Sequence, residues 1–144
     1  MRRFFLKQLA GADSWVVWYA VAKSAPIRAR FSDGESLWFH AASRALAMMS
    51  ASTRAKDIHL TIDRHSPSLL SDRRIADALG VELASNHAGY FPPIVTASSR
   101  DSMGSHGLQM ADFVAGAVFH FVEREDSSYL SMIESIVRSR MIER

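Results

Sequence analysis

The sequence predicts one α/β domain in which helices pack on a sheet. Residues 15–22 (WVVWYAVA) and residues 57–65 (DIHLTIDRH) have the β-branched, aromatic and alternating character of strands. Stretches with apolar residues at three- and four-residue spacing lie between and after them, as in amphipathic helices. Strands that alternate with helices are typical of α/β folds. A chain of 144 residues fits a single domain, residues 1–144, around one core.

The first third of the chain predicts a helix, a strand and a loop. Residues 2–10 form a short amphipathic helix that Gly11 ends. The strand 15–22 is apolar on both faces, so we expect it in the middle of the sheet, covered on both sides. Residues 24–35 predict a loop or a short edge strand broken at Pro26.

A capped helix and a half-buried strand follow. Asp33 or Ser32 is a suitable cap for a helix over residues 35–50. In the strand 57–65 the apolar and polar side chains alternate. The core face carries Ile58, Leu60 and Ile62, and the opposite, more polar face carries His59, Thr61 and Asp63.

The last part of the chain predicts two strands and three helices. Residues 66–80 form a capped helix that ends at Gly80, and residues 81–85 and 92–98 are short strands. The final helices span residues 107–123 and 127–140.

Composition limits the chemistry. The chain has no cysteine, which excludes disulfides and thiolate metal sites, so a bound metal would be Mg²⁺ or Mn²⁺ held by oxygen or imidazole. The formal charge of +2 gives only slight support for a nucleic-acid partner. No apolar run approaches the roughly 18 residues of a membrane span, so we expect a soluble, cytoplasmic protein.

One carboxylate, Asp112, lies near the start of the apolar helix 107–123. At about 100° per residue its neighbours Gln109, Gly116 and Glu123 form a narrow polar stripe, and apolar residues fill the remaining arc. The pattern predicts a largely buried helix whose polar stripe opens on a thin strip of solvent or on a cleft. Asp112 either stabilises the positive end of the helix dipole or belongs to a site, and both explanations stay open.

Two other acids are candidates for the same site. Asp63 ends a strand, where it caps the turn, pairs with Arg64, or meets Asp112 across the sheet. Asp101 lies in a serine-rich loop, where a solvated turn residue is the usual role. Converging carboxylates are how two-metal phosphodiesterase sites gather ligands. The sequence has no phosphate-binding glycine loop, GxSxG or HExxH motif.

The stretch RDSMGSHGLQMADFVAGAVFHFVERED (100–126), with YLSMIESI after it, resembles the end of the family called domain of unknown function 3800. Members end in Asp-Ser, a few residues, and then Gly-Leu-Gln-x-Ala-Asp before a helix rich in small residues. The strand HLTIDR, which ends in Asp63 and Arg64, is similar to an internal strand of that family. The matching positions of the terminal motif are Asp101, Ser102, Gly107, Leu108, Gln109, Ala111 and Asp112.

This resemblance implies a ribonuclease H-like mixed sheet with flanking helices. It also implies a Mg²⁺- or Mn²⁺-dependent nuclease in which Asp63 and Asp112 hold the metal and Asp101 is an accessory catalytic acid. The family opens with a strand that carries an Asp-Glu-Ser motif, whereas this sequence begins with a helix. We therefore expect a partial, N-terminally truncated domain that is inactive in this form.

Two other functions stay open. A non-catalytic binding or assembly module with the same fold would use an exposed sheet edge, to which a second copy or a partner could add a strand. A nucleic-acid adaptor would rest on charge alone, because the arginines form pairs without a long basic run.

Overall fold

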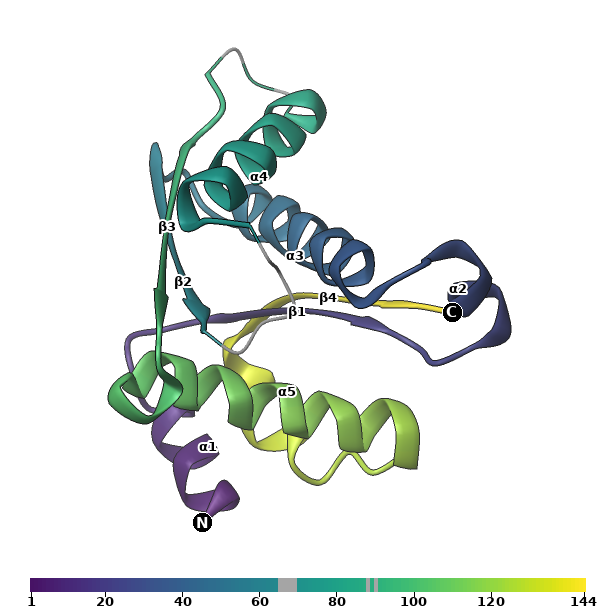
Figure 1. Cartoon of the computed structure of the whole chain (residues 1–144). Coiled ribbons are helices and arrows are strands. Elements are labelled where there is room, and N and C mark those ends of the chain that lie inside the picture. The colour runs from purple at the N-terminus through teal and green to yellow at the C-terminus, as the bar shows by residue number, and fades with distance from the viewer. Residues whose placement is uncertain (65–69, 88, 90) are drawn as a thin grey trace.

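The structure is a computed structural model that describes residues 1–64, 70–87, 89 and 91–144. Helices lie on two sides of a layer of strands (Figure 1). Along the chain the elements are α1 (Arg2–Ala10), β1 (Val16–Val21), α2 (Ala25–Arg30), α3 (Gly34–Ala51), β2 (Asp57–Asp63), α4 (Asp72–Asn86), β3 (Ile94–Arg100), the 3₁₀ helix η1 (Ser102–Gly104), α5 (His106–Arg124), the 3₁₀ helix η2 (Leu130–Ile136) and β4 (Val137–Glu143).

The strands form two separate parallel pairs. β1 pairs with β4, and β2 pairs with β3 in a register that sets Asp63 opposite Arg100. The chain is therefore an α/β protein, as the sequence predicts, but both described pairs are parallel, whereas the resemblance implies a mixed sheet. Within the described residues, however, no backbone ladder joins the two pairs into one sheet.

Each pair of strands has its own hydrophobic core, so the expectation of a single core is wrong. The first core includes the fully buried Leu6 and Ile133 and joins α1, β1, α5 and η2. The second includes Ile75 and Leu79 and joins α3, β2, α4 and β3. In Figure 1, α3 lies on one side of the β1–β4 pair and α1 and α5 lie on the other, whereas α4 lies beside the β2–β3 pair.

Several predicted elements are confirmed. The helix 2–10 and the strand in 15–22 are present, and helices α3 and α5 both contact β1, so both of its faces are covered. The expected place of this strand in the middle of a sheet is wrong, because among the described residues β1 pairs with β4 alone. Asp33 caps α3 by accepting a hydrogen bond from the Ser36 amide. In β2 the buried Ile58 and Ile62 alternate with exposed residues, as the polar and apolar pattern predicts. Residue 65, the end of the predicted strand, lies outside the described residues.

The loop expected over residues 24–35 is wrong in part, because residues 25–30 form the helix α2. Pro26 lies in the first turn of this helix. A proline is compatible with that position, since the amide it lacks would have no partner within the helix. Ile27 is buried and attaches α2 to the rest of the protein.

The predicted end of a helix at Gly80 is also wrong, and so is the strand over residues 81–85. Helix α4 begins after Ser71, whose side chain accepts a hydrogen bond from the Arg74 amide, and it continues to Asn86. Gly80 packs against Val95 of β3, and Leu83 extends the buried face past the glycine. Tertiary packing therefore outweighs the helix-breaking tendency of glycine. Residues 66–69 of the predicted helix lie outside the described residues.

The helix predicted over residues 127–140 is replaced by η2 and β4. Leu130 and Ile133 are buried in the first core, which explains the helical spacing up to Ile136. The following residues, Val137–Glu143, pair with β1. This long-range pairing cannot be read from the local sequence, because a strand partner more than 100 residues away decides it.

Candidate functional site

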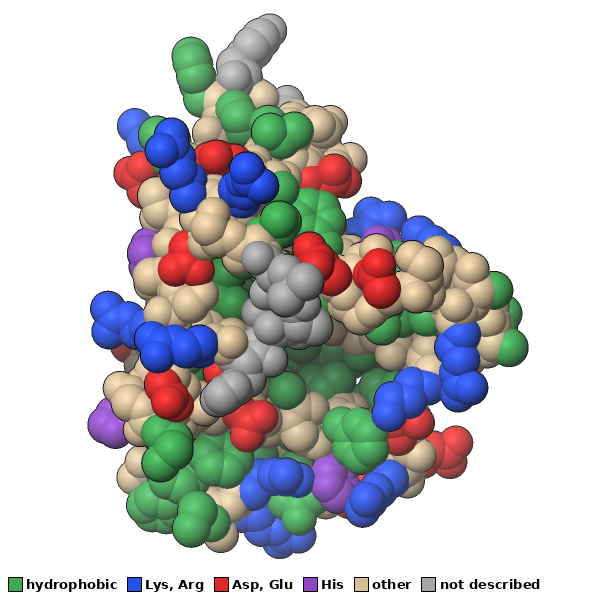
Figure 2. Space-filling model, viewed as in Figure 1, with side chains coloured by type: hydrophobic (Ala, Val, Ile, Leu, Met, Phe, Trp, Pro, Cys, Tyr) green, Lys and Arg blue, Asp and Glu red, His purple; other side chains and the backbone are tan. Residues whose placement is uncertain are grey.

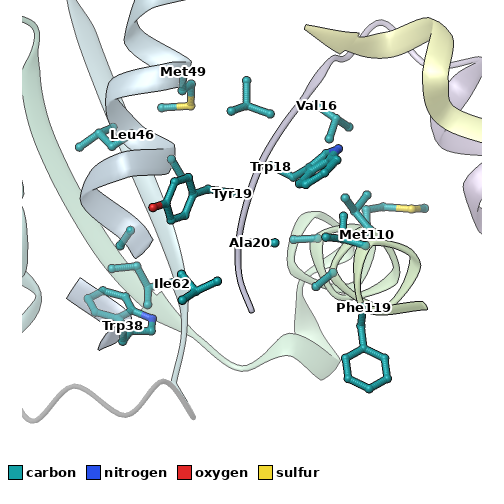
Figure 3. Close-up of a pocket in the computed structure, with 18 of the residues that line it drawn as sticks. Val16, Trp18, Tyr19, Ala20, Trp38, Leu46, Met49, Ile62, Met110 and Phe119 are labelled. Atoms are coloured by element: carbon teal, nitrogen blue, oxygen red, sulfur yellow. The ribbon is translucent and has the colours of Figure 1, made fainter. Parts of the chain in front are cut away.

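An apolar slot separates the two pairs of strands. Its cavity volume is about 920 Å³. The slot is bounded by residues 15–21 along β1, residues 60–62 in β2, the inner face of α3 and one face of α5. Figure 2 shows it as a hollow whose depth is hydrophobic, and Figure 3 shows its lining.

Consecutive residues of β1 and β2 line the slot. Because successive side chains of a strand point to opposite faces, a cavity that touches every residue in turn lies along the strand's edge. One edge of β1 is bonded to β4 and one edge of β2 to β3. Within the described part of the chain, no strand pairs with the other edge of either, and both of these strands border the slot.

The side chains of β1 cover both sides of this edge. In Figure 3, Val16, Trp18 and Ala20 point toward Met110 and Phe119 of α5, whereas Tyr19 points toward the α3 side. The slot therefore lies between the helices α3 and α5, and apolar side chains line both of its faces. Its α3 face is formed by Trp38, Ala42, Ala45, Leu46 and Met49.

Helix α5 turns an apolar stripe into the slot. Gly107, Ala111, Ala115 and Phe119 follow each other at four-residue spacing, so they share one face of the helix. All four are exposed, and Phe119 keeps 44% of its surface in solvent. The predicted narrow polar stripe is therefore wrong, because the exposed side of α5 includes these apolar residues beside Asp112.

Two cations lie at one mouth of the slot. Lys23, just after β1, has its Nζ 6.0 Å from the centroid of the Phe119 ring, and Arg124 has its Cζ 5.9 Å from the same centroid. Glu123 also lines the slot and offsets one of the two charges. This mouth therefore carries a net charge of +1 from these three residues.

The structure places the three predicted acids on different elements. Asp63 is the half-buried last residue of β2, and Asp112 is exposed on α5. Ile62 and Ala111, their neighbours in the chain, both line the slot, so the two acids belong to elements that meet there. Asp101 caps η1, where its Oδ1 accepts a hydrogen bond from the Met103 amide at 2.9 Å. Asp101 therefore has the turn role that its loop position indicates.

The described residues do not form a ready metal centre. Among residues 1–64, 70–87, 89 and 91–144, no group of three or more histidine, aspartate or glutamate side chains is placed to hold an ion. The proposed Mg²⁺ or Mn²⁺ ligands Asp63 and Asp112 therefore stay a prediction.

Sequence reasoning missed the role of Asp72. Its Oδ2 accepts a hydrogen bond from the Ser99 amide at 2.8 Å, and its Oδ1 accepts one from the Ser99 hydroxyl. These bonds to the ionised carboxylate lower the pKa of Asp72. They attach the first turn of α4 to β3. The Ser71-Asp72 pair signals a helix start in the sequence, but nothing local identifies Ser99 as the partner.

A second missed cluster joins four elements beside the slot. The carboxylate of Glu143 in β4 accepts hydrogen bonds from the Tyr19 hydroxyl and from the Arg30 guanidinium, and it lies 2.7 Å from His40 Nε2. These hydrogen bonds lower the pKa of Glu143 to about 2. Burial and the same carboxylate raise the pKa of Tyr19 to about 12. The cluster cannot be found from the sequence, because it depends on the pairing of β1 with β4.

The open face of the β2–β3 pair is polar. His59 shares hydrogen bonds with Thr96 Oγ1 through Nδ1, at 2.8 Å, and with Ser98 Oγ through Nε2, at 3.0 Å. Both ring nitrogens are therefore engaged with the neighbouring strand, which is a structural role for this exposed histidine.

No family model, curated protein or solved structure matches this chain. Among the described residues, no helix is long and apolar enough to cross a membrane.

Proposed function

We propose that this protein is a binding module that receives an extended segment of a partner polypeptide as a β-strand in the slot. Two strand edges that have no strand partner among the described residues border one apolar cavity between two helical layers, and this observation supports the proposal. The arrangement would then be a ribonuclease H-like layered sheet completed from outside. Strand addition of this kind uses backbone hydrogen bonds for affinity and side-chain pockets for specificity.

Two effects favour the insertion of a strand into the slot. Amides and carbonyls at an open strand edge gain partners when a strand is added, and such edges are otherwise a hazard for aggregation. The apolar lining contributes roughly 25 cal/mol for each Å² that the partner removes from water. Phe119, Ala111 and Ala115 supply surface of this kind, because they are exposed and apolar.

Tryptophan fluorescence offers a direct test, because all three tryptophans of the chain, Trp15, Trp18 and Trp38, line the slot. The probe is a tryptophan-free peptide with about seven Val, Ile and Leu residues, matched to the length of β1, and a soluble Ser-Gly-Ser tail. We expect saturable binding that shifts the emission. A copy of the peptide with alternate backbone amides methylated should bind poorly, because it cannot form an edge ladder.

Two matched variants test whether the peptide binds in the slot or elsewhere on the protein surface. Ala115→Arg places a charge in the slot and should abolish peptide binding, whereas Ala51→Arg changes an exposed alanine at the end of α3, outside the slot lining. Equal binding by the methylated peptide, or unchanged binding by Ala115→Arg, would contradict strand addition. Sedimentation of the free protein tests separately whether it forms a homo-oligomer, since a second copy is another source of the strand.

A metal-dependent nuclease is the second candidate function. It rests on the resemblance of the terminal motif and on the position of Asp63 and Asp112 on two elements that line the slot. Two carboxylates are few for a two-ion site, which usually needs three or four. We therefore expect slow or no cleavage of single-stranded or duplex DNA and RNA in Mn²⁺, with any activity lost in Asp112→Asn and kept in Asp77→Asn. Brisk, Asp112-dependent cleavage would contradict the view of an inactive domain.

A further inference from the structure

The two faces of the slot define the chemistry of its occupant. The α5 face presents the stripe Gly107, Ala111, Ala115 and Phe119, and the α3 face presents Trp38, Ala42, Ala45 and Met49. An inserted strand would point successive side chains alternately at these two faces. A strand with one polar face would bury polar groups against apolar side chains, which costs free energy. The occupant is therefore apolar on both faces, like the strand β1 beside it.

The length of the occupant follows from its neighbour. Six residues of β1, Val16–Val21, span about 20 Å at roughly 3.3 Å per residue. A partner that follows this edge needs six or seven extended residues before it leaves the slot. Residues beyond that point emerge at the mouth where Lys23 and Arg124 flank Phe119.

The charge at this mouth favours one kind of residue beside the occupant. The opposite end of β1 also has a cation, since Arg138 has its Cζ 4.5 Å from the centroid of the ring of Trp15, which lines the slot. Lys23 and Arg124 are both exposed and lie on opposite elements, the segment after β1 and the end of α5. Figure 2 shows blue side chains at the right rim of the hollow, with red side chains beside them. With Glu123 counted, the three residues leave a charge of +1, which favours an acidic group beside them.

We propose that the partner segment is a β-strand of six or seven residues, apolar on both faces, with an aspartate or glutamate directly beside it at the Lys23–Arg124 mouth. This inference rests on the proposed strand-binding function and adds the sequence that the slot selects. The positive rim attracts the acid, and the apolar faces exclude a one-faced amphipathic strand.

Peptides with blocked ends test both features. The reference peptide has the all-apolar core, and a second replaces every other core residue with Thr or Ser. We expect the second peptide to bind at least about tenfold more weakly, because several buried apolar side chains are lost. Equal affinity would overturn the requirement for two apolar faces while leaving strand binding in place.

A second series places one Glu, Gln or Lys beside the core, at either end. At the end beside Phe119, we expect Glu to bind about twofold to fivefold more tightly than Gln, and Lys to bind more weakly, as for an exposed ion pair. The preference should shrink in Lys23→Gln and Arg124→Gln, and in high salt, but not in Arg73→Gln, which changes an exposed arginine of α4.

The outcomes separate the two proposals. Binding without any charge preference overturns the acidic end and keeps the strand-binding function. Failure of every peptide, with a fluorescence signal that none of them changes, overturns both. A dimer in which a second copy fills the slot and blocks all peptides overturns the assignment of the occupant to a partner of this chemistry.

Discussion

Glu143 links β4 to three other elements through Tyr19, His40 and Arg30. Its side chain is 19% exposed, so its hydrogen bonds are only partly screened by water. We expect Glu143→Gln to lower the free energy of unfolding by about 1–2 kcal/mol at neutral pH, because charge-assisted hydrogen bonds are lost. Urea denaturation measures this. Glu134→Gln is the matched control, since its pair with Arg140 is about half exposed and should change stability by less than about 1 kcal/mol.

The same cluster predicts a pH dependence with a definite sign. The pKa of Glu143 falls from 4.5 to about 2 in the folded protein, so its contribution is complete above pH 4.5 and is lost as the pH falls toward 2. The pKa of Tyr19 rises from 10.0 to about 12, so its contribution is lost as the pH rises from 10 toward 12. The stability difference between wild type and Glu143→Gln should therefore shrink in acid. A constant difference down to about pH 2 would contradict the cluster.

At the scale of elements, Asp72 fixes the start of α4 on β3. Its carboxylate accepts from both the amide and the hydroxyl of Ser99. We expect Asp72→Ala to destabilise the protein clearly more than Asp77→Ala, because Asp77 is 72% exposed and has only a 4.0 Å pair with Arg73. Amide exchange at Ser99 should accelerate in the first variant alone. The pKa of Asp72 is lowered in the folded state, so its contribution should also fade in acid.

The elements also show which features of the fold the sequence can predict. The alternation around Ile58 and Ile62 and the Asp33 cap are local signals, and the structure confirms both. Gly80 wrongly predicts the end of a helix, because its position against Val95 is part of the packing of α4 on β3. β4 cannot be predicted locally, since residues 127–140 carry helical spacing and only the edge of β1 makes 137–143 a strand.

The candidate site also has parts that the local sequence predicts and parts that only the tertiary structure shows. Asp101 has the turn role that its loop indicates. The slot, in contrast, arises where β1, β2, α3 and α5 meet, and its lining comes from segments far apart in the sequence. Apolar residues such as Ala111 and Phe119 look like ordinary core positions in the sequence, and only the tertiary arrangement shows that they face a cavity.

At the scale of the whole molecule, the protein is two hydrophobic cores with a slot between them. Each core holds one parallel pair of strands, and α5 contacts both β1 and β2. A strand that paired with both open edges, at the usual spacing of about 4.8 Å, would join the two pairs into one five-stranded sheet. Binding and stability are then linked, because a ligand that binds only the folded state raises the free energy of unfolding.

Because binding and stability are linked, a bound strand should slow amide exchange along β1 and β2. In a strand with one paired edge, only alternate amides have a ladder partner, so we expect every second amide of Val16–Val21 to exchange quickly in the free protein. The saturating apolar peptide should slow those amides in β1 and in β2 together, and it should raise the midpoint of thermal unfolding. At a peptide concentration 100 times its Kd, the stabilisation is about 2.7 kcal/mol. Protection confined to one of the two strands would show that the peptide adds to a single edge, and the two cores would then stay separate sheets.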